Sequence, residues 1–246
     1  MIKKVSAAVI VAAIAGTFAS AAEASHSWGN YHWARTANPF TVKLGDNVSS
    51  AWDAYLTQAS VDWSQSTGGN PVRTTIVPGS TTGKKCAATV GRVEVCNAAY
   101  GKRGWLGIAS ISINQSHITQ ATTKMNDTYY APGTKYDAPV WRAAVMCQEI
   151  GHAWGLDHQD ESGADLDTCM DYANNPDANN MHPNAHDYEQ LALIYSHFDS
   201  STTIGLSAKD GAKPYKTERK DGRRASKIVE TYSDGSKKVT FIYWAV

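Results

Sequence analysis

The stretch that decides the fold covers residues 147–158 and reads CQEIGHAWGLDH. Within a helix, residues four apart lie on one face, so Gln148 and His152 are expected to point to the same side. Gly155 lets the chain turn sharply out of that helix, and the turn can bring His158 back toward His152. The spacing therefore places an amide and two imidazoles around one point, where a metal ion could bind.

The residues before this stretch indicate where the helix begins. Asp137 offers a capping carboxylate, and Pro139 suits the first turn, where a backbone amide needs no partner. We expect the helix to run to about Trp154 and to end at Gly155. Further on, Met170 follows a cysteine in a predicted tight turn.

This arrangement resembles the metzincin superfamily of zinc proteases, and within it the matrixin-type branch. The family pattern is His-Glu-x-x-His-x-x-Gly-x-x-His, followed by a turn that carries methionine. The chain matches it at Glu149, His152, Gly155, His158 and Met170. In the order of its elements, the resemblance covers roughly residues 32–198.

The resemblance implies a secreted zinc-dependent metalloendopeptidase that acts on a peptide or protein substrate. His152 and His158 would bind zinc through ring nitrogens, and Glu149 would be the general base for a metal-activated water. Met170 would support the metal from below, and Tyr172 would help to line the substrate cleft.

Gln148 departs from the pattern, because the family has its first histidine ligand at this position. A glutamine carbonyl oxygen is neutral and a poorer zinc donor than imidazole. Gln148 could still bind zinc, or Asp157 or Asp160 could complete the site instead. The remaining interpretation is a catalytically inactive pseudo-protease that binds peptide or protein without zinc. A structural surface protein would have neither a peptide cleft nor an activity.

The expected fold is α/β (α+β) and metzincin-like. A twisted, mixed, five-stranded sheet packs on two long helices, and a third helix follows the methionine turn. Hydrophobic periodicity places helices at residues 51–64 and 187–197, and strands within residues 32–45, 72–77 and 105–113. We expect the strand at 105–113 to be the edge along which an extended substrate pairs.

The chain contains four cysteines, and its N-terminus indicates export. Residues 1–24 combine Lys3 and Lys4, a short apolar run and small residues, which is typical of a removable signal peptide. An even cysteine count in an exported chain indicates two disulfides, with three possible connectivities. Cys86 and Cys96 flank a short segment and favour a local bridge, which leaves Cys147 for Cys169.

The domain organisation follows from these segments. Residues 1–24 are the signal peptide, residues 25–200 form the protease-like domain, and residues 201–246 form a small C-terminal β appendage. The formal net charge of +0 gives no indication of a nucleic-acid partner. We expect an extracellular monomer that has no membrane contact after removal of the signal peptide.

Two groups of polar residues remain outside the pattern. The acidic loop containing Asp160, Glu161, Asp165 and Asp167 offers oxygen ligands for calcium, although its spacing matches no EF-hand loop. The remaining histidines share no spacing and are interpreted as surface or capping residues: His117, His182, His186 and His197.

Overall fold

The computed structural model describes residues 26–205, 214–220 and 224–245. The predicted signal peptide lies outside these residues. Within them, the helices are α1 (Asp53–Trp63), α2 (Pro139–His152) and α3 (Ala185–Ile194), with short 3-10 turns η1 (Thr67–Gly69) and η2 (Asn179–Met181). No helix in the described ranges has the length and apolar character needed to cross a membrane.

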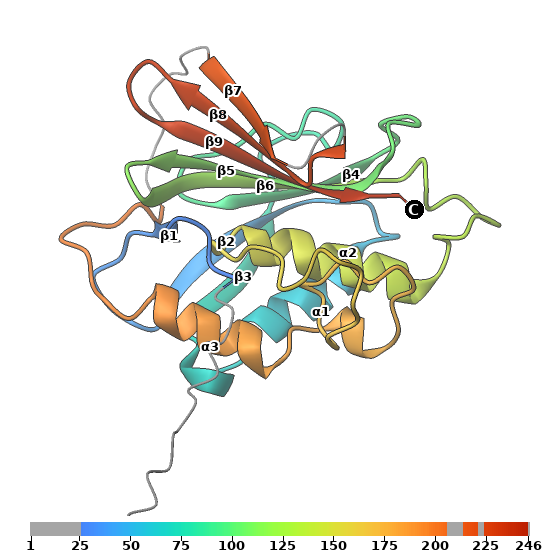
Figure 1. Cartoon of the computed structure of the whole chain (residues 1–246), viewed down its shortest axis with the longest axis horizontal. Coiled ribbons are helices and arrows are strands. Elements are labelled where there is room, and N and C mark those ends of the chain that lie inside the picture. The colour runs from blue at the N-terminus through green and yellow to red at the C-terminus, as the bar shows by residue number, and fades with distance from the viewer. Residues whose placement is uncertain (1–25, 206–213, 221–223, 246) are drawn as a thin grey trace, which may run out of the picture.

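One mixed sheet dominates the structure, and the helices lie on one side of it (Figure 1). Over the described residues it has nine strands in the order β3-β2-β4-β6-β5-β9-β8-β7, with β1 paired to β6. The strands are β1 (His32–Trp33), β2 (Phe40–Asn47), β3 (Val72–Pro78), β4 (Val93–Ala98), β5 (Trp105–Asn114), β6 (His117–Asn126), β7 (Pro214–Lys220), β8 (Lys227–Tyr232) and β9 (Lys237–Trp244). The α/β fold class expected from the sequence is confirmed.

The sheet is larger than the five strands expected. Its first five strands in spatial order, β3 to β5, correspond to the predicted sheet, with β3, β2, β4 and β6 parallel and β5 antiparallel. The C-terminal strands extend this same sheet, because β9 pairs with β5 along residues 105–113. The segment expected as a small β appendage therefore supplies three strands of the main sheet.

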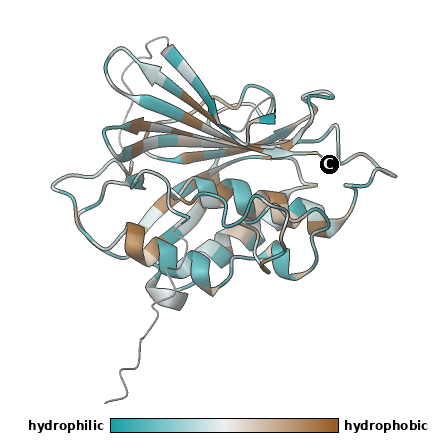
Figure 2. Cartoon of the chain, viewed as in Figure 1, coloured by the Kyte–Doolittle hydropathy of each residue, from teal (hydrophilic) through white to brown (hydrophobic). Residues whose placement is uncertain are grey.

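The core lies between the sheet and the helices. In β2, Phe40, Val42 and Leu44 are buried while the residues between them are exposed, as the alternation predicts. Helix α2 is buried over most of its length, since every residue from Ala143 to His152 is buried. Hydrophobic residues accordingly occur along the strands and on the helices that pack below them (Figure 2). The polar side chains of α2 therefore lie in the interior.

Candidate metal centre

The end of α2 and the turn after it bring two histidines together. His152 is the last residue of the helix, and Gly155 adopts a φ of +96° three residues later. A Cβ at Gly155 would collide with the carbonyl oxygen of Tyr31, so both the backbone angle and the close approach require glycine. The chain then returns and places His158 Nε2 3.0 Å from His152 Nε2.

The outer ring nitrogens of both histidines are held by acceptors. His152 Nδ1 lies 2.9 Å from the carbonyl oxygen of Leu156, and His158 Nδ1 lies 2.8 Å from Glu161 Oε1. A carbonyl or carboxylate oxygen can only accept, so each Nδ1 carries a proton and each ring turns its Nε2 inward. A shared proton or a bound cation can hold two such nitrogens at this distance.

The histidine spacing suits a zinc ion. Bonds of about 2.0–2.1 Å in a tetrahedral site separate two nitrogens by roughly 3.3 Å, close to the distance seen here. Burial and the neighbouring His158 hold the pKa of His152 well below its usual value, which keeps the ring neutral. Hydrogen bonds from His158 and Ser226 lower the pKa of Glu161 to about 2. Their effect outweighs that of burial, which raises the pKa.

Gln148 connects α2 to the methionine turn. Its Nε2 donates to the carbonyl oxygens of Cys169, at 2.8 Å, and Asp171, at 2.7 Å. These two hydrogen bonds fix the orientation of the amide. Its Oε1 is buried without a hydrogen-bond partner in the described part of the chain. A buried orphan acceptor one helical turn before His152 fits a metal ligand.

Glu149 faces β5 across a gap left by a glycine. A Cβ at Gly107 would overlap Glu149 Oε1, so the strand has room for this carboxylate because it lacks a side chain there. Both carboxylate oxygens are buried without a hydrogen-bond partner among the described residues. Burial raises the pKa of Glu149 well above its usual value, and the nearby backbone of Ala109 acts in the opposite direction. This is the environment of a general base or acid.

The methionine turn packs directly beneath the histidine-bearing helix. Met170 is fully buried, and its Sδ lies where a Cβ on Gly151 would be, so the absence of a side chain at Gly151 lets the turn approach. The disulfide Cys147–Cys169 joins helix and turn, and Cys86–Cys96 is the second disulfide of the structure.

The C-terminal strands cover the candidate metal centre. The Phe241 ring of β9 stacks on His152, with 4.1 Å between centroids and 6° between planes. The Tyr172 ring lies 4.5 Å from that of His158, and its hydroxyl donates to the carbonyl oxygen of Ile242. The prediction that residues 105–113 form a free edge is wrong, because β5 pairs with β6 on one side and β9 on the other.

The alternative ligands considered from the sequence already have partners, but Asp157 also lies with His158 and Glu161 in a group whose ligand atoms are within 4.8 Å of one another. Asp157 forms an ion pair with Lys227, and Asp160 accepts hydrogen bonds from Ser162, Gly163 and Ala164. The acidic residues do not converge as one group either: Asp165 and Asp167 meet Asp177 at the surface.

The histidines interpreted as scattered surface residues do not all stand alone. His182 pairs with Asp62, and the His186 ring lies 4.9 Å from that of His26. His117 and His197, in contrast, converge with His32 on Asp199. No local spacing could have revealed this second cluster, since His32 and His197 are 165 positions apart.

Comparison with known proteins gives few matches. No protein family and no curated protein sequence matches the chain. Two solved structures of myroilysin resemble it. The first is 13% identical in sequence, and the match covers 67% of this chain and 96% of that chain with a TM-score of 0.38. The other has 14% identity, covers 67% of this chain and 86% of that chain, and gives a TM-score of 0.35. A likeness at this level carries no argument about activity.

Proposed function

We propose that the chain is an exported zinc-dependent endopeptidase. The observation that carries the proposal is the pair of inward-facing Nε2 atoms of His152 and His158, 3.0 Å apart, each with its Nδ1 held by an acceptor. His152, His158 and the orphan Oε1 of Gln148 would hold the ion. Zinc bound there would supply Lewis acidity that activates water and polarises a peptide carbonyl.

The chain's own residues supply the remaining chemistry. Glu149 would take a proton from the attacking water and pass it to the leaving amine nitrogen. Its raised pKa suits this exchange, because the carboxylate binds a proton readily and can then give it up. The two disulfides agree with an oxidising compartment, which supports export.

Zinc analysis of the mature oxidised protein tests the proposal. His158→Ala should lower the zinc content by one equivalent per chain and abolish hydrolysis of unstructured peptides. Gln148→His should bind this zinc more tightly, since imidazole is a better donor than an amide oxygen. Zinc that appears at this site only in the Gln148→His variant would favour the alternative, a pseudo-protease that binds peptide without metal. The Gln148 amide, already bonded to the turn, is the observation that keeps that alternative open.

Peptide access requires the C-terminal strands to move. In the present arrangement β9 occupies the edge of β5 where a substrate would pair, and Phe241 covers His152. We therefore propose that β8 and β9 separate from β5, or are removed, before substrate binds.

A disulfide across the β5–β9 pair tests this movement. Ser110 and Thr240 are directly opposite, with their hydroxyl oxygens 3.0 Å apart, so a Ser110→Cys/Thr240→Cys pair should crosslink the strands. The crosslinked protein should lose peptide hydrolysis and regain it after mild reduction, which should spare the buried native disulfides. The single Ser110→Cys variant is the control. Equal activity in the crosslinked and reduced forms would exclude the movement.

A further inference from the structure

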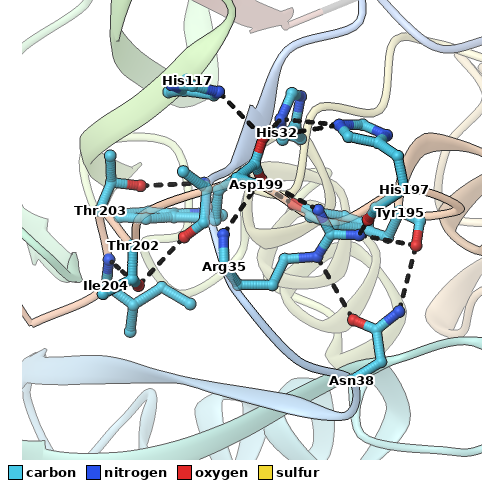
Figure 3. Close-up of polar contacts among 12 residues, drawn as sticks. His32, Arg35, Asn38, His117, Tyr195, His197, Asp199, Thr202, Thr203 and Ile204 are labelled. Atoms are coloured by element: carbon cyan, nitrogen blue, oxygen red, sulfur yellow. Dashed lines mark hydrogen bonds and ion pairs between the residues drawn. The ribbon is translucent and has the colours of Figure 1, made fainter.

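A second group of metal-ligating side chains lies outside the candidate metal centre. His32 belongs to β1, His117 begins β6, and His197 and Asp199 follow α3. Figure 3 shows these side chains around the Asp199 carboxylate, with His117 on one side and His197 on the other. Segments distant in the sequence thus deliver three imidazoles to one carboxylate.

The distances match the edges of a metal coordination shell. His32 Nε2 lies 3.3 Å from Asp199 Oδ1 and 3.2 Å from His197 Nε2, and His197 Nε2 lies 3.7 Å from the same carboxylate oxygen. A tetrahedral zinc site with bonds of about 2.0–2.1 Å has edges of roughly 3.3 Å. One ion can therefore contact all three atoms with small adjustments.

The hydrogen bonding of His32 directs its Nε2 toward two neighbours at once. Its Nδ1 lies 2.6 Å from the carbonyl oxygen of Asn30 and must donate to it, so Nε2 is the ring nitrogen that faces Asp199 and His197. A proton on Nε2 could be directed to one of these neighbours but not to both. A metal ion satisfies both contacts at once.

The surroundings hold the carboxylate ready. The backbone amide and guanidinium of Arg35 donate to Asp199 Oδ2, at 3.1 and 3.2 Å, which leaves Oδ1 facing the histidines. His117 Nε2 approaches that Oδ1 at 3.1 Å and acts as a positioning residue. His32 is 3% exposed and the His197 side chain is 49% exposed, so an ion could enter from solvent on the side of His197.

We propose that His32, His197 and Asp199 form a second metal centre, which binds one Zn²⁺ with solvent at the fourth position. Two imidazoles and a carboxylate are a donor set that zinc accepts. The ion would connect β1 to the segment after α3. Because such a site exists only in the folded chain, zinc binding should stabilise the fold.

Elemental analysis and calorimetric titration with Zn²⁺ alone test this centre. In the full mature chain, His197→Ala should remove one zinc equivalent. The zinc at the candidate metal centre, which His158→Ala removes, should stay bound. In the His158→Ala background, where this centre is the zinc site that remains, His197→Ala should weaken binding by about 100-fold or more. Zinc should raise the melting temperature of the His158→Ala variant. It should not raise that of the His158→Ala/His197→Ala double variant.

His182→Ala is a matched control. The His182 side chain is also 49% exposed and also pairs with an aspartate, Asp62, but within the described ranges it belongs to no group of metal-ligating side chains. The His182→Ala variant should bind zinc as tightly as the natural sequence does. Circular dichroism checks that each variant is folded, and Asp199→Asn provides a second test of the ligand set. The proposal is overturned if the His158→Ala chain binds no zinc, or if His197→Ala binds it as tightly as His182→Ala does.

Discussion

Glu94 on β4 and Glu149 on α2 are equally buried, with 0% of each residue exposed, but their surroundings are opposite. Glu94 accepts hydrogen bonds from Arg92 at 2.7 Å, Ser80 at 2.5 Å and Asn47 at 2.6 Å. Among the described residues Glu149 has no side-chain partner on either oxygen, and only the nearby backbone of Ala109 counteracts its burial. Their pKa values shift in opposite directions as a result, to about 2 for Glu94 and well above the usual value for Glu149.

The contrast separates a structural carboxylate from a functional one. Burial of a charge is tolerated when hydrogen bonds and an opposite charge replace the lost water, as Arg92, Ser80 and Asn47 do for Glu94. A carboxylate that is buried without such replacement lowers stability, and it is retained where chemistry needs it. We therefore assign Glu149 to the proposed site and Glu94 to the framework.

The largest expected effect is on catalysis. Glu149→Gln should lower kcat/KM for peptide hydrolysis by about 100- to 10,000-fold, because it removes the proton acceptor and keeps the side-chain volume. Glu94→Gln, assayed at a temperature where it is folded, should stay close to the natural sequence, because Glu94 lies in the framework rather than in the site. Equal activity losses in the two variants would contradict the contrast between them.

The next effect is on stability. Glu94→Ala should lower the free energy of unfolding by about 3 kcal/mol, since it leaves the Arg92 charge and the donors of Ser80 and Asn47 without their buried acceptor. Urea denaturation monitored by tryptophan fluorescence measures the change. A loss below about 1 kcal/mol would mean that solvent replaces the network easily.

These two glutamates also show what the sequence could reveal. Glu149, His152 and His158 lie within one short stretch, so helical spacing and one glycine were enough to place them near each other. Glu94 carries no such signal, because Asn47 and Ser80 come from distant parts of the chain. The same reason hid the pairing of β9 with β5 and the contact between His32 and His197. Local periodicity predicts elements and short motifs, whereas partners brought together by sheet topology remain out of its reach.

A smaller effect of opposite sign is expected at the candidate site. Glu149→Gln should raise the stability of the zinc-free protein by about 1–2 kcal/mol, because it removes an ionisable group that is buried without a partner. The same denaturation experiment in EDTA measures the gain. Should Glu149→Gln instead destabilise the zinc-free chain, the carboxylate has a structural role like that of Glu94, and the contrast between the two fails.

The pH dependence of stability sharpens the contrast further. Burial alone raises the pKa of Glu94, but hydrogen bonds from Arg92, Ser80, Thr89 and Asn47 outweigh it and lower the pKa from 4.5 to about 2. The folded state thus releases this proton more readily than the unfolded state, so the ionised carboxylate stabilises the fold fully above pH 4.5. That contribution declines as the pH falls toward 2. The stability difference between the natural sequence and Glu94→Gln should therefore be constant at pH 5–7 and shrink steadily below pH 4.5. A difference that stays constant down to pH 2.5 would mean that Glu94 titrates normally and that its hydrogen bonds do not favour the charged form.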